Sequence, residues 1–254
     1  MILDKFRLDH KVALVTGAHK GLGQAIAIAL AQAGADIVAL DRSEPAETRA
    51  AIAALGRRFF WLQADLAQTT PADLHALVAE AVRQAGHLDI LVNNAGIIRR
   101  GAALEFSEAD WDDVLQVNLK ALFFLSQAAA QVMVQQGGGK IINIASMLSF
   151  QGGIRILSYT AAKSGVAGVT RALANEWAKH NINVNAIAPG YMATDNTAPL
   201  RADPDRNQAI LDRIPAGHWG RPEDLQGAVV FLASSASDYV HGAILPVDGG
   251  WLAR

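Results

Sequence analysis

Two side chains in the segment SYTAAKSG, residues 158–165, have the types and spacing of a proton-transfer pair. Tyr159 and Lys163 are four residues apart, about one helical turn, so both would leave the same face of a helix. A phenol and an ammonium ordinarily lose their protons near pH values of about 10 and 10.4. A positive charge beside the phenol would lower the phenol's pKa and bring proton exchange closer to neutral pH. The alternative is that Lys163 is a solvated charge on a helix.

A second segment has the composition of a phosphate-binding turn. TGAHKGLG, residues 16–23, follows an apolar run and precedes a helix-forming run. Gly17, Gly21 and Gly23 would permit a tight turn and close approach of the backbone to a pyrophosphate, which the N-terminus of the helix attracts. A glycine motif alone is weak, but a strand before it and a helix after it predict a dinucleotide site.

The end of the second apolar run bears on the choice of cofactor. Asp41 lies 18 residues after Gly23 and could accept hydrogen bonds from the adenosine ribose while repelling a 2′-phosphate, which favours NAD. Lys20 in the glycine turn and Arg42 beside Asp41 could instead meet a 2′-phosphate, or be plain surface charges. NAD is therefore the expected cofactor, and NADP is not excluded.

Apolar runs of strand length alternate with helix-period segments along the chain. Expected strands are KVALVT (11–16), DIVAL (36–40), RFFWL (58–62), LDILV (88–92), KIINIA (140–145), INVNAI (182–187) and AILPV (243–247), and expected helices lie at 22–34, 71–86, 107–137 and 158–180. Continuous apolar strands are typical of a sheet covered on both faces. We predict one α/β domain over residues 1–254, a Rossmann-type doubly wound sheet of seven mainly parallel strands with helices on both faces. Residues 190–221 are polar, interrupt the alternation and are expected to form a substrate lid.

Composition excludes several classes of function. The 254 residues contain no cysteine, which excludes thiol catalysis, disulfides and Cys–zinc sites. The net charge of −2 argues against nucleic acid or a membrane surface as a partner. No signal-peptide run and no apolar stretch of about 18 residues is present, and the seven histidines lack metal-ligand spacing. The expectation is a cytoplasmic protein without a metal.

With these motifs placed, the chain resembles the short-chain dehydrogenase/reductase family over nearly its whole length. TGAHKGLG is similar to that family's TGxxxGxG turn, NNAG (93–96) to its turn after the fourth strand, and SYTAAK to its YxxxK. Ser146, 13 residues before Tyr159, and Asn118, in VLQVNLKALF, stand where the family places catalytic residues. NAIAPGYMAT (185–194) matches the stretch that meets the nicotinamide.

The resemblance implies roles for four residues. Tyr159 would be the acid–base group for hydride transfer, Ser146 would bond the substrate oxygen, Lys163 would also bind the nicotinamide ribose, and Asn118 would hold a water in the proton relay. Ser146 could otherwise be a strand-end cap, and Asn118 could bond its own backbone. The implied cofactor site consists of Gly17, Lys20, Gly21, Leu22, Gly23, Asp41, Asp65, Leu66, Asn93, Ala95, Gly96, Tyr159, Lys163, Pro189, Gly190, Met192 and Thr194.

Three arginines near the active tyrosine suggest a carboxylate substrate. Arg99, Arg100 and Arg155 all follow expected strand ends, and a guanidinium binds a carboxylate with two charge-assisted hydrogen bonds. At least one of them is expected to be a solvated surface charge. The segment from GYMATDNTAPLRAD to ILDRIPAGHWGRPEDL, together with the ending VDGGWLAR, resembles family members that act on deoxy sugar acids, such as 2-deoxy-D-gluconate or 2-keto-3-deoxy-D-gluconate. The expected substrate site consists of Arg100, Ser146, Gln151, Arg155, Tyr159 and Tyr191.

Other functions fit parts of the pattern. An NADPH-dependent ketoreductase, such as a 3-oxoacyl-carrier-protein reductase, would differ in cofactor preference. A non-catalytic nucleotide-binding regulator usually lacks one of the four catalytic residues, all of which are present here. A purely structural oligomer subunit would leave Ser146, Tyr159 and Lys163 without a role. The family implies a homotetramer built by the helices that carry Asn118 and Tyr159.

Overall fold

The computed structural model describes all 254 residues, and its centre is one sheet of seven strands. The strands are β1 (Val12–Thr16), β2 (Asp36–Asp41), β3 (Phe59–Gln63), β4 (Ile90–Asn93), β5 (Gly139–Ile144), β6 (Ile182–Pro189) and β7 (Ile244–Val247). Their order is β3-β2-β1-β4-β5-β6-β7, and every neighbouring pair is parallel. The predicted doubly wound sheet is confirmed, and it is parallel throughout rather than mainly so.

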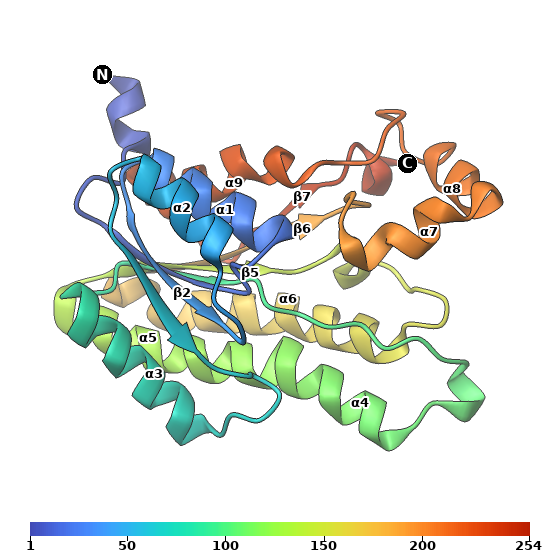
Figure 1. The fold of residues 1–254 in the computed structure, drawn as a ribbon, viewed down its shortest axis with the longest axis horizontal. Helices are drawn as coiled ribbons and strands as arrows, with labels where there is room; N and C mark the ends of the chain where they lie inside the picture. The colour runs from blue at the N-terminus through green and yellow to red at the C-terminus, as the bar shows by residue number, and fades with distance from the viewer.

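Helices cover both faces of the sheet (Figure 1). They are α1 (Gly21–Gln32), α2 (Ala46–Ala54), α3 (Pro71–Ala85), α4 (Glu108–Leu115), α5 (Ala121–Gln136), α6 (Leu157–Trp177), α7 (Ala198–Ala202), α8 (Pro204–Leu211) and α9 (Gln226–Ala233). α1, α2 and α9 lie on one face, and α3, α5 and α6 lie on the other. Each face has its own apolar core, one including Ile26 and Leu30 of α1, the other including Leu74 of α3 and Leu125 of α5.

The strand order reverses between β1 and β4, and this places the ligand crevice. β1 leads through α1 to β2 on one side, whereas β4 leads through α5 to β5 on the other. In open parallel sheets, ligands bind where the carboxyl ends of strands meet such a reversal. Every residue of β1 and of β4 is buried, so the strands that flank this crevice are firmly held in the core.

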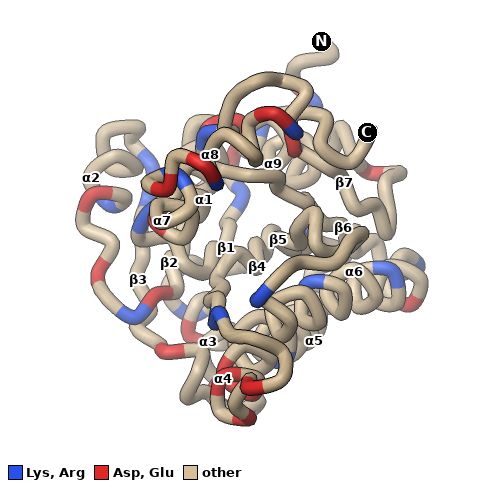
Figure 2. Tube along the Cα trace, turned by 90° about the vertical axis from the view of Figure 1, so that its right-hand side faces the viewer, with Lys and Arg blue, Asp and Glu red and all other residues tan.

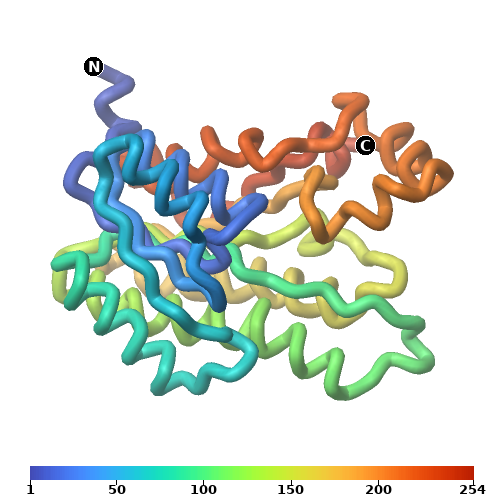
Figure 3. The backbone as a smooth tube through the Cα atoms, in the orientation of Figure 1, coloured from blue at the N-terminus to red at the C-terminus, as the bar shows by residue number.

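The segment that follows β6 lies beyond the carboxyl edge of the sheet. It contains a 3-10 turn, η6 (Asp195–Thr197), and the short helices α7 and α8, where the sequence suggested irregular structure. Figure 3 shows α7 and α8 at the same end of the molecule as the C-terminus, away from the N-terminus. Ile210 and Ile214 pack with Trp251 near that C-terminus, so the segment is anchored by apolar contacts.

One continuous helical stretch, Glu108–Gln136, is long and apolar enough to cross a membrane by composition alone. It consists of α4, a π-helical turn η3 (Gln116–Lys120) and α5. Leu125, Ala129 and Met133 of α5 are fully buried in the core that the helix shares with the sheet. This packing accounts for its apolar character.

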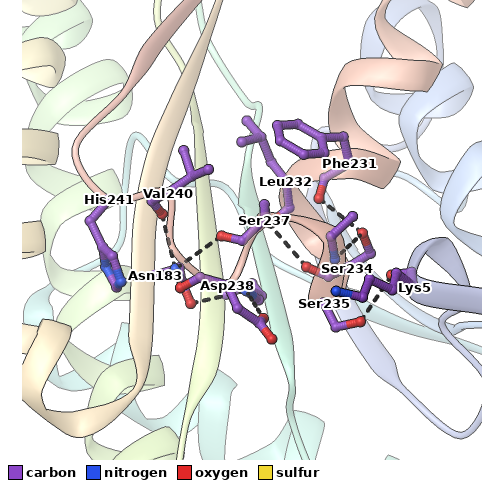
Figure 4. A network of polar contacts seen from close by, with 12 residues as sticks. Lys5, Asn183, Phe231, Leu232, Ser234, Ser235, Ser237, Asp238, Val240 and His241 are labelled. Carbon is purple, nitrogen blue, oxygen red and sulfur yellow. Dashed lines mark hydrogen bonds and ion pairs between the residues drawn. The ribbon is translucent and has the colours of Figure 1, made fainter. Parts of the chain in front are cut away.

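A polar network closes the opposite, amino edge of the sheet (Figure 4). Asn183, at the start of β6, donates through Nδ2 to the carbonyls of Ser237, Asp238 and Val240 at 2.9–3.3 Å. Its Oδ1 accepts from Lys140 Nζ at 2.9 Å. Asn183 is only 5% exposed, so these bonds fix the loop that leads into the edge strand β7.

Candidate active site

A cavity of about 850 Å³ opens at the crevice between β1 and β4. Its wall runs from the glycine turn after β1, past the ends of β2 and β3, to α6 and the segment after β6. Figure 2, viewed from the side of α7 and α8, shows basic and acidic residues interspersed around this end of the molecule. Thirteen of the predicted cofactor residues line the cavity: Gly17, Lys20, Gly21, Leu22, Gly23, Asp41, Asp65, Leu66, Ala95, Gly96, Tyr159, Lys163 and Thr194.

The glycine turn has a shape that only glycine permits. Gly17 and Gly21 have φ angles of +68° and +59°, which side chains rarely adopt. A Cβ on Gly23 would lie 1.9 Å from the carbonyl oxygen of Gly17. Asn94 Nδ2 donates to the carbonyls of Thr16 and Gly17 at 2.9 and 3.1 Å and so holds the turn from the end of β4. Asn94 was not among the predicted residues, although it stands in the NNAG motif.

The N-terminus of α1 supports binding of a dinucleotide at this turn. Lys20 caps the helix without a side-chain hydrogen bond, so the backbone N–H groups of the first turn receive no side-chain acceptor. Gly21, Leu22 and Gly23 of that turn all line the cavity. Unpaired N–H groups and the positive end of the helix dipole suit a pyrophosphate. The residues present therefore fit the predicted cofactor.

Two charged groups mark the end of the cavity near β2. The carboxylate of Asp41 accepts hydrogen bonds from the backbone N–H groups of His19 and Arg42 at 3.0 and 2.8 Å. Lys20 forms an ion pair with Asp195 of η6, with 2.5 Å between Nζ and Oδ2. This ion pair joins the glycine turn to the segment after β6, although both side chains are largely exposed.

The predicted catalytic residues come together at the end of β5 and the start of α6. Ser146 follows β5 and is 7% exposed, and Lys163 is 3% exposed. Lys163 Nζ donates to the carbonyl oxygen of Ile144 at 2.5 Å and lies 5.6 Å from the centre of the Tyr159 ring. Burial lowers the pKa of Lys163 to about 8.

The pKa of Tyr159 differs from the sequence-based expectation. Burial raises it, and this effect exceeds the lowering by the hydroxyl of Ser146 and by the charge of Arg100. Lys163 was expected to lower the pKa of Tyr159, but the structure does not show this effect. The amine of Lys163 is instead bonded to the backbone of Ile144, and the protein around the half-buried Tyr159 desolvates the phenol.

Asn118 lies in the π-helical turn between α4 and α5. Its side chain accepts from the N–H of Ile97 at 2.8 Å and donates to the carbonyl of Ile97 at 2.9 Å. Bonding to its own helix, the alternative reading of Asn118, is therefore not what the structure shows. The wider turn places the amide against the irregular segment that follows NNAG, and such turns recur at functional sites.

Four predicted cofactor residues do not line this cavity. Asn93 is 4% exposed and donates to Ser126 and Asn143 in the interior, because its side chain leaves β4 toward the helices. Gly190 and Met192 line a separate pocket of about 170 Å³, and Pro189 is a buried residue of β6.

The structure distinguishes the arginines. Arg99 lines the cavity, but its guanidinium is paired with Asp110 and Asp113 of α4. Arg155 is exposed and has a φ of +63°. Arg100 donates to the carbonyl of Asn196 at 3.1 Å, and its charge lowers the pKa of Tyr159. Arg100 is therefore the arginine whose charge reaches the phenol.

The other two predicted substrate residues meet at Trp251. Gln151 accepts a hydrogen bond from the indole N–H of Trp251 at 3.2 Å. The Tyr191 ring centre lies 4.8 Å from that of Trp251 and 5.3 Å from that of Trp219. Tyr159 packs on the same apolar cluster, so these side chains form one wall beside the phenol.

Comparison with known proteins agrees with this geometry. A family model described as Enoyl-(Acyl carrier protein) reductase matches residues 17–252. The chain is 66% identical over 255 residues to the 2-dehydro-3-deoxy-D-gluconate 5-dehydrogenase of Escherichia coli, and both chains are covered completely. A solved structure from Agrobacterium tumefaciens, provisionally identified as a 2-deoxy-D-gluconate 3-dehydrogenase with bound NADP, is 59% identical, with a TM-score of 0.90 and 98% and 99% of the two chains covered. A gluconate 5-dehydrogenase from Burkholderia cenocepacia in complex with NADP and tartrate is 40% identical, with a TM-score of 0.95 over both whole chains.

Proposed function

The chain belongs to the short-chain dehydrogenase/reductase family and is an oxidoreductase, and on that premise we propose that it is an NAD-dependent dehydrogenase of a deoxy sugar acid. The proposed substrate is 2-dehydro-3-deoxy-D-gluconate or the related 2-deoxy-D-gluconate. The observation that carries the proposal is the convergence of Ser146, Tyr159 and Lys163 beside the charge of Arg100. The full-length identity of 66% to a 2-dehydro-3-deoxy-D-gluconate 5-dehydrogenase supports the same substrate.

The proposed chemistry assigns one task to each side chain. When bound, the nicotinamide supplies the acceptor or donor of hydride. Tyr159 takes the hydroxyl proton of the alcohol in oxidation and returns it to the carbonyl oxygen in reduction. Ser146 donates to the same substrate oxygen, and Lys163, buried with a pKa of about 8, is a proton carrier close to neutral pH. Asn118 holds the backbone at Ile97, next to the cavity wall.

Arg100 is proposed to bind the carboxylate of the substrate. Among the three arginines, Arg99 already has two carboxylate partners. Arg100 and Arg155 are both exposed, and of these two only Arg100 lowers the pKa of Tyr159. Arg100 has only the carbonyl of Asn196 as a hydrogen-bond acceptor, so its guanidinium retains donors for a ligand. Gln151 and Tyr191, on the wall formed with Trp251, are proposed to contact the sugar chain.

NAD is proposed as the preferred cofactor, although two related structures are described with NADP. Asp41 lines the cavity at the end of β2, where its carboxylate would oppose a 2′-phosphate. Two cations could attract that phosphate: Lys20 is paired with Asp195, and Arg42 lines the cavity beside Asp41. The segment 190–221 is proposed to act as the substrate lid. The expectations of a homotetramer and of a cytoplasmic location stay predictions.

Two variants test the substrate. A charge-assisted hydrogen bond contributes ~1.5–3 kcal/mol, so Arg100→Gln should raise KM for the sugar acid by about one to two decades. The same change should leave KM for an uncharged lactone of that acid nearly constant. Arg99→Gln is the matched control, because Arg99 is held by acidic residues of α4. Equal KM values in Arg100→Gln and the wild type, or a wild type that prefers neutral alcohols, would refute the carboxylate assignment.

A further inference from the structure

A chain of buried hydrogen bonds crosses from the sheet into α6. Asn93 Nδ2 donates to Asn143 Oδ1 at 2.9 Å, and Asn143 Nδ2 donates to Thr170 Oγ1 at 3.0 Å. The Thr170 hydroxyl in turn donates to the carbonyl of Val166 at 2.7 Å. Asn143 and Thr170 are both fully buried. Asn143 accepts from Asn93 through Oδ1 and donates to Thr170 through Nδ2, so the orientation of its amide is fixed from both sides.

The same strand and helix share a second hydrogen bond. Lys163 of α6 donates to the backbone carbonyl of Ile144, the residue that follows Asn143 in β5. Thr170 follows Lys163 by seven residues, about two helical turns or ~10 Å along the axis. Because α6 runs back along the sheet, the two bonds occur in opposite sequence order along β5 and α6, and they are two separate points of attachment between these elements.

Apolar packing alone would not set the position of α6 along the strand. The helix buries mainly small side chains, including Ala162, Ala167 and Ala174. Contacts between small apolar surfaces are non-directional and tolerate small shifts at little cost. Hydrogen bonds in a dry interior are directional and specify one arrangement, because an unpaired polar group there is costly.

We propose that Asn143 and Thr170 are positioning residues of the active site, whose hydrogen bond fixes the register of α6 against β5 and so holds Tyr159 before Ser146. Neither residue lines the cavity, and neither touches the reacting atoms. The inference rests on the proposed role of Tyr159 as the acid–base group. A displacement of about 1 Å at such a group can lower the rate by up to 10²-fold, so the position of α6 along β5 affects the rate of the reaction.

A matched pair at Thr170 separates the hydroxyl from the shape of the side chain. Thr170→Val keeps the volume and removes the hydrogen bond, and turnover should fall about ten-fold or more while KM for NAD changes less than two-fold. Thr170→Ser restores the hydroxyl and should recover turnover to within two-fold of the wild type. Wild-type turnover in Thr170→Val would overturn the proposal. So would a Thr170→Ser variant whose turnover is as low as that of Thr170→Val.

Ser126 provides the control for general destabilisation. It lies on α5, is fully buried and accepts a hydrogen bond from Asn93 at 2.9 Å, but α5 carries none of the proton-transfer groups. Ser126→Ala should lower Tm and leave turnover within two-fold. If Ser126→Ala reduces turnover as much as Thr170→Val does, the buried chain only stabilises the fold and the positioning role is wrong.

A double variant covers the case in which Thr170→Val does not fold. Asn143→Leu combined with Thr170→Val removes both partners of this hydrogen bond, so no unpaired amide is left at position 143, and Asn93 keeps Ser126 as an acceptor. Its turnover should still be at least ten-fold lower, and wild-type turnover would refute the proposal.

A readout without substrate separates this proposal from the proposed function. The titration of Lys163 can be followed by NMR of ¹³C-labelled lysine, with its resonance assigned by its loss in Lys163→Met. We expect the pKa near 8 to be kept in Ser126→Ala and to change by half a unit or more in Thr170→Val. An unchanged titration in the valine variant would count against positioning, whereas a wild type inactive on sugar acids would refute only the proposed function.

Discussion

The buried amine of Lys163 should make the protein less stable than a variant without it at neutral pH. Its pKa of about 8 lies well below the ordinary value of 10.5, because burial disfavours the charged form. Below pH 8 the folded protein holds a charged amine that is 3% exposed. Lys163→Met keeps most of the side-chain volume and removes that charge. We therefore expect a variant that is inactive and yet as stable as the wild type or more so at pH 7.

The magnitude follows from the two pKa values. At ~1.4 kcal/mol per pH unit, a pKa lowered from 10.5 to about 8 corresponds to a cost of roughly 3 kcal/mol that is complete below pH 8. The cost declines as the pH rises from 8 to 10.5, because in this range the folded protein has released the proton while the unfolded chain still holds it. The Lys163→Met variant also lacks the hydrogen bond to Ile144. This loss lowers its stability by about 1–3 kcal/mol at every pH and offsets part of the gain. The change with pH in the stability difference between the two proteins therefore tests the effect of burial more directly than the difference measured at one pH.

Urea unfolding of both proteins without cofactor, at pH 7 and at pH 10, measures this dependence. The free energy of unfolding of the wild type should rise by about 2.5 kcal/mol relative to Lys163→Met between these values. Groups that titrate equally in the two proteins cancel in the difference. Lys179→Met removes an exposed lysine and should show no such change. Parallel pH curves for Lys163→Met and the wild type would refute the argument that burial controls this amine.

Three further changes test other parts of the structure. Gly23→Ala should weaken NADH binding, measured by fluorescence, at least ten-fold, because its Cβ would lie 1.9 Å from a backbone oxygen, whereas Gly227→Ala has open space and should bind normally. Asp41→Ala should raise the ratio of kcat/KM for NADP⁺ to that for NAD⁺, and a wild type that already prefers NADP⁺ would show that Asp41 does not decide the choice. Asn183→Ala should lower the free energy of unfolding by about 2 kcal/mol, since it removes the buried network before β7, and a change under about 0.5 kcal/mol would contradict that role.

The regular part of the fold was predictable because the signals were local. All seven strands lie within about two residues of the apolar runs, and the four expected helical segments are present. α2 was not predictable from the sequence, because its N-cap is Pro45 without a side-chain hydrogen bond and its alanine-rich run has little periodicity. The π-helical turn that contains Asn118 also has no recognisable pattern in the sequence.

The catalytic and glycine motifs were predictable in position, but their tertiary contacts were not. In NNAG the sequence did not show which asparagine would face the glycine turn, and the structure assigns this role to Asn94. The choice among the arginines depends on partners distant in sequence, such as Asp110 and Asp113 for Arg99. The pKa of Tyr159 also depends on burial, which spacing along a helix does not reveal.

The central claim is that Tyr159 transfers the proton in the oxidation of a sugar acid. The most direct measurement is the formation of NADH from NAD⁺ and 2-dehydro-3-deoxy-D-gluconate by the wild type and by Tyr159→Phe, together with the Kd of each for NADH. Phenylalanine keeps the ring and removes the hydroxyl, so turnover should fall by about 10²-fold or more while the Kd for NADH stays within a few-fold. Turnover of Tyr159→Phe close to that of the wild type would contradict the account.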